Sequence, residues 1–412
     1  MLSTKHFQEL NDVAAELGKS GNWDTSVKLH QMLLLHSADC GDNNLILGIK
    51  KQLIISCWYS KNPEYREYAK QLCDEVGFDY DLPWEDRYYA RINSTWYAKS
   101  SKELYSKSFV KGITWRPDNG YNCMNPSICN YNGHIYLVIR TVNYDIHYTD
   151  NNHYYQMKDN DQWIVRTRNY LAELNTTLDI INIREIILPT TLPPVAFAQV
   201  IGFEDMRLFE HQGELWTSST VRQLVEDGHH HIVLAKMELL PDRAQLTEWK
   251  KIVPQHVPAS HEKNWMAISR GDSLNFVYKS EPQTLIDTDG NCVKETKNVW
   301  AFDAFRGGSP LIPFDNGYLS IIHETSVFSY MPRRYVHRFV YYNTDLNIEK
   351  ISEIFYFVEQ GIEFAAGMCY NTDHSRLLVS FGFKDKEAMI ASFDVLEVFR
   401  SLTPVPPVIT EE

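Results

Sequence analysis

Two adjacent carboxylates and a nearby arginine are the residues of this chain best suited to chemistry. Glu204, Asp205 and Arg207 stand at the start of a predicted hairpin with strands Met206–His211 and Glu214–Thr220. An inverting glycosidase needs one protonated carboxyl group near the leaving oxygen, with its pKa raised by burial or by a neighbouring charge, which Glu204 could supply here. Asp205 is the candidate for that role. The alternative interpretation is a structural ion pair between Asp205 and Arg207.

Similar polar loops precede four further predicted hairpins, and together the loops hold acids, amides and cations. The candidate substrate-binding residues are Asn125, Arg140, Asn143, Glu204, Arg207, Asn264, Arg306 and Glu363. Arg222, Lys263 and His323 add groups suited to holding an anion. Each cation taken singly is better explained as a solvated charge at a strand end. Glu363, in apolar surroundings, is equally well explained as a buried structural acid.

Five hairpins of one kind, roughly evenly spaced after about Leu104, would position these loops. The repetition predicts a mainly β fold, a five-bladed β-propeller, in preference to a large sandwich. Corresponding loops of successive blades surround the central channel at one end, so the polar loops are expected to converge there. The predicted hairpins are Ser127–Tyr131 with His134–Arg140, Met206–His211 with Glu214–Thr220, Trp265–Ser269 with Ser273–Tyr278, Pro310–Phe314 with Tyr318–His323, and Gly367–Tyr370 with Arg376–Phe381.

The first hundred residues have a different period, because their apolar residues recur at helical spacing. Phe7, Leu10 and Leu17 belong to one stripe, and further helices are predicted over Leu45–Tyr59 and Pro83–Tyr97. We therefore predict a helical hairpin domain at 1–103, similar to tetratricopeptide repeats, and the propeller at 104–412. The helical domain is expected to offer a docking surface for a protein partner and to carry no chemistry.

The composition is that of a globular protein without a basic face. The net charge is −13, with 44% hydrophobic and 23% charged residues, which argues against a nucleic-acid partner. The seven cysteines are odd in number and lack CxxC spacing, so free thiols are expected, with neither a disulfide framework nor a zinc site. No apolar segment has the length of a signal core or a membrane span, and a cytoplasmic location is expected.

The polar loops resemble those of a known family in residue type and order. The similar segments are Asn125-Pro126 followed by Tyr136-Leu-Val-Ile-Arg140, Phe203-Glu-Asp-Met-Arg207, Glu262-Lys-Asn264, and Gly307-Gly-Ser-Pro310 with His323. In this order they resemble motifs of glycoside hydrolase family 130, the inverting β-mannoside phosphorylases and hydrolases, and of the related β-1,2-mannosyltransferases. The resemblance covers the region from about Asn125 to Val398, roughly two thirds of the chain.

This resemblance implies roles for particular residues. Asp205 would be the proton donor, acting through a sugar hydroxyl, and Arg222, Lys263 and His323 would bind phosphate. Met206 replaces the family's proline, a departure that concerns the loop geometry more than the acid itself. The helical region is foreign to the plain phosphorylases and favours a role in glycan assembly.

The leading hypothesis is an inverting carbohydrate-active enzyme that makes or phosphorolyses a β-mannosidic linkage. Inorganic phosphate or a sugar phosphate would be its substrate, and neither a cofactor nor a metal is expected. His229-His-His231 is interpreted as an exposed turn. The first alternative is a nucleotide-sugar-dependent glycosyltransferase on the same propeller, because the same cations would hold a diphosphate. The second is a non-catalytic propeller that binds a glycan or a protein. Hydrolysis is less favoured because it needs a second carboxylate.

Overall fold

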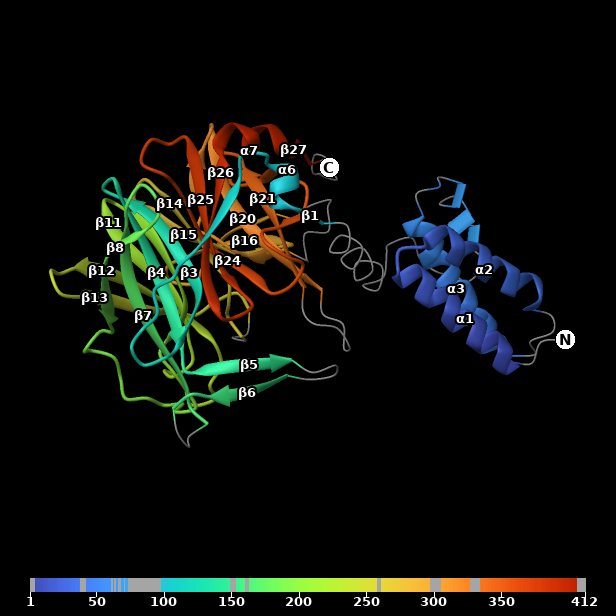
Figure 1. The fold of residues 1–412 in the computed structure, drawn as a ribbon, viewed down its shortest axis with the longest axis horizontal. Coiled ribbons are helices and arrows are strands. Elements are labelled where there is room, and N and C mark those ends of the chain that lie inside the picture. Colours follow the sequence, from blue (N-terminus) through green and yellow to red (C-terminus); the bar gives the residue numbers. More distant parts are fainter. Residues whose placement is uncertain are drawn as a thin grey trace. The chain divides into compact units, whose positions relative to one another are not determined.

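Two compact units, Met1–Tyr97 and Ala98–Glu412, make up the chain (Figure 1). The computed structural model describes residues 4–37, 42–60, 62, 64–65, 68–69, 71–72, 98–148, 153–159, 163–257, 261–296, 305–326 and 334–405. A short strand, β1 (Lys99–Ser100), pairs in parallel with β23 (Phe355–Tyr356). Residues 98–103, which the sequence analysis placed in the helical domain, therefore lie in the second unit.

The first unit is helical over its described residues. Its helices are α1 (Thr4–Lys19), α2 (Trp23–Leu35) and α3 (Asn43–Tyr59), and α2 packs against both of the others. Ser26 on α2 connects the three, because its hydroxyl donates to the Ala14 carbonyl at 2.7 Å and lies 2.8 Å from the Ser56 hydroxyl. The helix predicted over Leu45–Tyr59 is confirmed, whereas the one over Pro83–Tyr97 lies outside the described residues.

The second unit is mainly β and consists, over its described residues, of five antiparallel meanders. The first two are joined into one sheet where β8 and β13 pair in parallel. The strands of the meanders are, in turn, β3 (Asn122–Tyr131), β4 (His134–Val142), β7 (Val165–Leu174) and β8 (Ile180–Ile187); β10 (Phe203–His211), β11 (Glu214–Val221), β12 (His231–Leu239) and β13 (Ala244–Ile252); β14 (Met266–Arg270), β15 (Ser273–Ser280), β16 (Gln283–Asp287) and β17 (Cys292–Thr296); β18 (Arg306–Gly307), β19 (Ile312–Phe314), β20 (Gly317–Ser326), β21 (Arg334–Tyr342) and β22 (Ile348–Ile351); and β24 (Glu363–Tyr370), β25 (Arg376–Phe383), β26 (Glu387–Asp394) and β2 (Phe109–Gly112).

All five predicted hairpins are confirmed; most of their strands are longer than predicted, whereas β19 is shorter. Asn132-Gly133 and Gln212-Gly213 turn with positive φ at both positions, as two-residue hairpin loops require. The fourth turn, predicted at Asn316-Gly317, falls one residue earlier, at Asp315-Asn316, because Phe314 pairs with Gly317.

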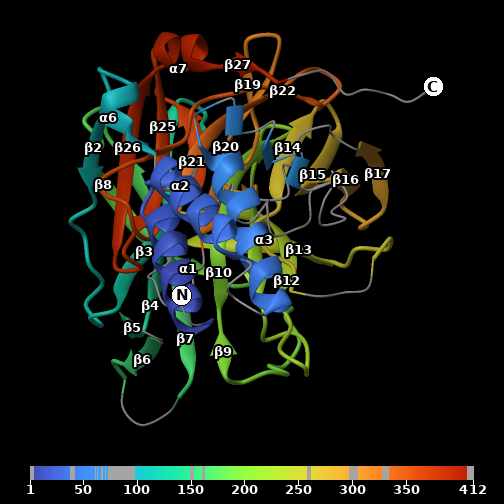
Figure 2. The same ribbon diagram turned by 90° about the vertical axis from the view of Figure 1, so that its right-hand side faces the viewer.

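The first strands of the meanders follow one another around a ring. β10 contacts β3 and β14, the third and fourth meanders meet where β15 contacts β18, and β24 contacts both β20 and β3. Figure 2 shows β15–β17 on one side of the unit and β2 with β26 on the other. Residues at the starts of several of these strands meet: Asn125 on β3 donates to Asp205 on β10, and Arg207 on β10 donates to Asn264, just before β14, and to the carbonyl of Gly308, just after β18.

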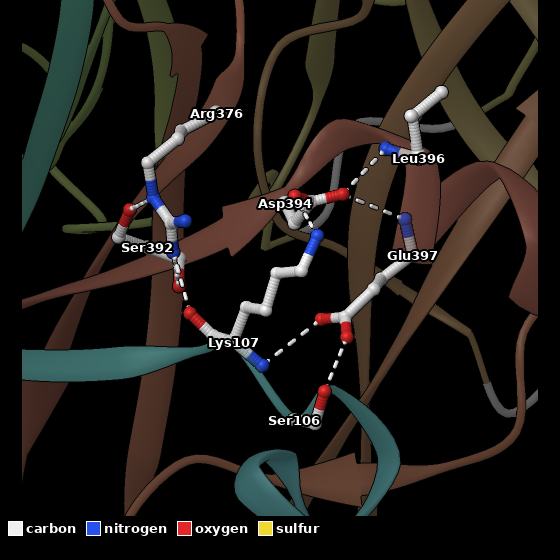
Figure 3. A network of polar contacts seen from close by, with 7 residues as sticks. All are labelled: Ser106, Lys107, Arg376, Ser392, Asp394, Leu396 and Glu397. Atoms are coloured by element: carbon white, nitrogen blue, oxygen red, sulfur yellow. Dashed lines mark hydrogen bonds and ion pairs between the residues drawn. The ribbon is translucent and has the colours of Figure 1, made fainter.

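The last meander is completed by β2 from the start of the unit, which pairs with β26. A polar network beside it fastens the same two chain segments (Figure 3). Lys107 pairs with Asp394 at 2.9 Å, and the Lys107 carbonyl accepts from Arg376 at 2.8 Å. Asp394 also caps α7 (Val395–Ser401) by accepting from the amides of Leu396 and Glu397. Segments far apart in the sequence thereby close the sheet.

The remaining elements are short. The hairpin β5 (Tyr144–Tyr148) and β6 (His153–Met157) extends from the first meander, at the bottom of Figure 1. The others are α6 (Ser101–Leu104), β9 (Val200–Ile201) and β27 (Thr403–Pro404). Among the described residues, no helix combines the length and the apolar character needed to cross a bilayer.

Candidate functional site

Three polar residues at the beginning of successive first strands share an unusual backbone conformation. Asn125, Asp205 and Asn264 have positive φ angles of 42°, 47° and 61°. Asn125 and Asp205 lie in β-bulges, where the register of β3 and β10 shifts. Asn and Asp tolerate left-handed backbone better than most residues, and bulges re-aim side chains beside active sites. The repeated feature turns these three polar side chains toward one end of the ring.

The bulge at Asp205 also overrides the alternation of side chains along a strand. Residues 204 and 205 would ordinarily point to opposite faces of a sheet. Here both carboxylates meet Arg140, with Arg140 Nη1 at 2.6 Å from Asp205 Oδ1 and Nη2 at 3.4 Å from Glu204 Oε2. Asn125 Nδ2 donates to the same Asp205 oxygen at 2.9 Å. Four of the predicted residues thus form one cluster across the first and second meanders.

Cations around Asp205 hold its carboxyl group in the ionised form, so the raised pKa expected of a general acid is not found. Burial by itself would raise the pKa of Asp205, but Arg140, the Asn125 hydrogen bond, Arg207 and Lys263 together lower it to about 2. Asp205 is therefore almost entirely a carboxylate at neutral pH. Its side chain keeps 18% of its surface exposed, so a ligand can reach it.

Arg207 is a buried residue that stabilises the cluster through its hydrogen bonds. Only 1% of the residue is exposed, and its guanidinium donates to the Gly308 carbonyl at 2.7 Å and to Asn264 Oδ1 at 3.0 Å. Burial lowers the pKa of Arg207 to about 10, against the raising effect of Asp205. The predicted substrate-binding residue thus uses its hydrogen bonds to connect the second meander to the third and the fourth.

Glycines let the neighbouring backbone come close to these side chains. A Cβ atom on Gly307 would collide with the Asn264 carbonyl oxygen, and one on Gly382 would collide with Asn125 Oδ1. The Gly307-Gly308 segment, predicted to form a site loop, therefore has a packing function that any other residue would disrupt.

The three residues proposed as phosphate ligands lie on the same end of the ring but differ in exposure. Lys263 is exposed and close enough to Asp205 to lower its pKa. Arg222 is half-buried, donates to the Gly228 carbonyl at 2.7 Å and lies over the Phe197 ring. His323 is 2% exposed, and its strand position pairs with that of Arg306. Burial, reinforced by neighbouring charges that include Arg207 and Arg306, lowers the pKa of His323 far below its usual value, so the imidazole is neutral.

The sequence analysis assigned no role to two histidines at this site. His230, which was interpreted as part of an exposed turn, is buried, and its Nδ1 lies 2.7 Å from Nδ1 of His261. Burial, with Lys263 and Arg222 nearby, lowers the pKa of His230 to about 3. The run of three histidines gave no signal for this, because His261 comes from another meander. In the described part of the chain, no three His, Cys, Asp or Glu side chains group as metal ligands.

Asn143 is committed to the structure rather than to an open site. The residue is fully buried, its amide donates to Asp159 at 2.5 Å and to the Ile164 carbonyl at 2.8 Å, and its oxygen accepts from the Arg166 amide at 2.7 Å. The sequence assigned Asn143 to substrate. These contacts instead indicate a structural role, in which Asn143 holds together the chain segments on either side of the β5–β6 hairpin.

Glu363 is likewise enclosed. Its carboxyl accepts from the backbone amides of Phe357, Val358 and Glu359 at 2.6, 2.7 and 3.0 Å, and it is 0% exposed. Burial raises the pKa of Glu363 to about 7, although the three amides lower it in part. Of the two interpretations that the sequence left open, these contacts fit the structural one.

Glu363 should make the stability of the protein depend on pH. Its pKa is 4.5 in the unfolded chain and about 7 in the fold, so its contribution is fully present below pH 4.5 and is lost as the pH rises through about 7. The loss amounts to up to about 3 kcal/mol of the free energy of unfolding. Urea unfolding of the wild type and Glu363→Gln at several pH values between 4.5 and 7.5 measures it as the difference between their slopes. Identical pH dependence in the two proteins would show that the three amides fully offset burial.

The cysteines of the described residues are free thiols, as the sequence predicted. They are Cys57, Cys123, Cys129, Cys292 and Cys369.

Comparison with known proteins gives structural similarity at low sequence identity. No protein-family profile and no curated protein sequence matches the chain. Among solved structures, a β-1,2-mannobiose phosphorylase from Listeria innocua shares 11% identity at a TM-score of 0.47, with 74% of this chain and 98% of that chain covered. A mannose phosphorylase from Leishmania mexicana shares 13% at 0.47, covering 78% and 98%. A GDP-Man-dependent mannosyltransferase from Leishmania mexicana shares 11% at 0.45, covering 69% and 89%.

Proposed function

We propose that the five meanders are the blades of a five-bladed propeller and that the chain is an inverting enzyme of glycosyl transfer with a phosphorylated donor. The observation that carries the proposal is an accessible, ionised Asp205 with cationic groups of three blades around it. β-Mannosidic linkages are the implied product, from the resemblance of the loop residues to the β-mannoside phosphorylases. We likewise propose, on the same resemblance, which residues contact the sugar and which bind the phosphate.

Because Asp205 is ionised in the resting protein, it can accept a proton, and this favours formation of the glycosidic bond over its cleavage. In synthesis, the acceptor hydroxyl loses its proton to the carboxylate, directly or through a sugar hydroxyl. The acceptor oxygen then bonds to the anomeric carbon from the face opposite the leaving group, and the bond from that carbon to the phosphate oxygen breaks with its electron pair on the phosphate. Phosphorolysis reverses these steps and needs Asp205 protonated, which a pKa of about 2 disfavours.

Cations around the leaving group would take the place of a second catalytic carboxylate. Lys263 and Arg222 lie beside His230, and Arg306 is exposed at the same end of the ring. A hydrolase needs a second carboxylate that activates water. Of the candidate acids, Glu204 pairs with the same arginine as Asp205, and Glu363 is held by three amides. The enclosure of Glu363 favours transfer from a phosphorylated donor over hydrolysis.

A donor assay tests the proposal. The full chain is incubated with mannose 1-phosphate or GDP-mannose, each with mannose or a manno-oligosaccharide as acceptor. We expect a lengthened product, with release of phosphate or of nucleoside diphosphate and a β-linkage by NMR. Turnover with neither donor would contradict the enzyme and support the remaining alternative, a propeller that only binds a glycan or a protein.

A further inference from the structure

Two histidines from different meanders meet beside the candidate site. His230 lies just before β12, and its Nδ1 atom is 2.7 Å from Nδ1 of His261, in the segment that leads into β14. The backbone reinforces this contact, because the Glu262 amide donates to the His230 carbonyl at 3.0 Å. His230 is 9% exposed, whereas His261 is open to solvent. The roles derived above use neither ring, although together they fix the start of the segment that carries Lys263.

His261 lies where an anion would be held. It lines a cavity of about 410 Å³ together with Lys263 and Arg306, and Glu281 adds a carboxylate to the same lining. Lys263 is close enough to Asp205 to lower the pKa of that carboxyl. Ammonium and guanidinium groups gathered in this way attract an anion with several oxygens. An anion bound by Lys263 would therefore lie beside the His261 ring.

The contact between the two rings leaves His261 able to carry a positive charge. A hydrogen bond between two imidazole nitrogens needs one N–H and one lone pair, so at least one of the rings is neutral. His230 is that ring, because burial, with Lys263 and Arg222 nearby, lowers its pKa to about 3. When His261 takes up a proton, its Nδ1–H donates to the lone pair of His230, and its Nε2–H is left to donate to an anion.

Other charged groups face His261 from both meanders. The ring of His229 lies 4.7 Å from that of His261, and His229 Nδ1 lies 3.3 Å from Asp227 Oδ2. Asp227 and Glu281 favour a proton on His261, whereas the cations named above, and His229 when charged, oppose it. A bound dianion adds negative charge next to the ring and so favours the protonated form.

We propose that His261 is a further ligand of the phosphoanion, which it binds as an imidazolium, and that His230 is the residue that positions it. The inference rests on the proposed function and adds a binding residue to its anion site, for any phosphorylated donor. His261 takes up a proton from solvent as the anion binds, so the affinity for the anion depends on pH.

Calorimetric titration of the full chain with sulfate tests the role of His261. Sulfate has the tetrahedral shape of phosphate and keeps its full negative charge over the range used. Its affinity is expected to rise about five- to tenfold from about pH 8 to about pH 6, because an ordinary histidine titrates near 6.5 and a bound anion favours its charged form. His261→Ala should weaken binding about tenfold at pH 6 and remove this rise.

His134→Ala is the matched control for His261→Ala. His134 is also an exposed histidine with one close partner, since its Nδ1 lies 2.8 Å from Glu173 Oε1. It lies at the turn between β3 and β4, at the end of β3 remote from Asn125. Sulfate affinity and its pH dependence should be unchanged in this variant.

The positioning role of His230 has its own test. His230→Ala should weaken sulfate binding nearly as much as His261→Ala, and the double variant should bind no more weakly than either, because both residues act through one contact. His230→Asn places an oxygen acceptor where Nδ1 stood and should recover part of the affinity. The Tm of each variant establishes that it is folded.

The outcomes separate this inference from the proposed function, because none of these measurements needs turnover. Wild-type protein that does not bind sulfate, or equal affinity and pH dependence in the wild type and His261→Ala, would remove His261 from the anion site. Additive losses in the double variant, or no recovery in His230→Asn, would contradict the role of His230. Turnover of a donor with an unaffected His261→Ala keeps the function and overturns the inference. The expected sulfate results without turnover of any donor keep the anion site and contradict the enzyme.

Discussion

Asp205→Asn should lower kcat for glycosyl transfer about 10³-fold while the protein remains folded. General acid–base catalysis by a single side chain is typically worth about 10² to 10⁴ in rate. The amide still accepts from Asn125 and Arg140 but cannot take the proton of the acceptor. Because the pKa of Asp205 is about 2, the wild type should lose no activity through protonation of this group above about pH 4. Steady-state rates with the donor identified above measure both effects.

The same substitution at Asp272 is the control. Asp272 is exposed in the turn between β14 and β15, at the opposite end of the ring, and Asp272→Asn should leave kcat unchanged. Circular dichroism and the Tm establish that Asp205→Asn is folded. A folded Asp205→Asn protein with the wild-type rate would remove Asp205 from the mechanism, and the fault would then lie in the proton-transfer assignment alone.

Arg207→Ala should be the most destabilising single change at the site, lowering the free energy of unfolding by about 3 to 5 kcal/mol. The substitution leaves the Gly308 carbonyl and Asn264 Oδ1 without their charged donor, and it removes a buried positive charge that faces Asp205. It also opens a cavity under Phe364, whose ring lies 5.7 Å from the guanidinium carbon. Denaturation in urea, followed by tryptophan fluorescence, measures the loss.

Two further variants test whether the hydrogen bonds of Arg207, rather than its charge or its removal as such, stabilise the protein. Arg207→Lys keeps the charge but cannot reach both acceptors, so it should recover only part of the lost stability. Arg270→Ala, at an exposed position on β14, should change the free energy of unfolding by less than about 0.5 kcal/mol. A loss at Arg207→Ala no greater than at Arg270→Ala would mean that the contacts beneath the cluster do not hold the meanders together.

The hairpins and the identity of the proton-transfer candidate could be predicted from the sequence. Turn pairs such as Asn132-Gly133 and alternating strand residues are local signals, since hairpin geometry depends on φ angles that few residues adopt. Asn125, Asp205 and Asn264 were singled out as polar residues before strands, and their types suit the left-handed backbone that they have. Patterns of this kind act over a few residues, so they can be read from the chain alone.

Which candidate residues are paired, buried or exposed could not be predicted from the sequence, because this depends on contacts in the tertiary structure. Glu204 and Asp205 share Arg140 because a bulge turns both to one side, whereas strand alternation alone predicts opposite faces. His230 meets His261 from another meander. Glu363 resembled the other candidate acids in sequence, yet it accepts from three backbone amides and has no exposed surface.

The candidate residues and the short-range turns and strands could therefore be predicted from the sequence, because they depend on residue type and on neighbours in the chain. The tertiary structure determined which of them are exposed, paired or ionised. Burial and charge interactions are set by residues far apart in the sequence, and the pKa of Asp205 depends on groups from three meanders at once. For this chain, the contacts between meanders bring polar residues that are far apart in the sequence into one site around Asp205.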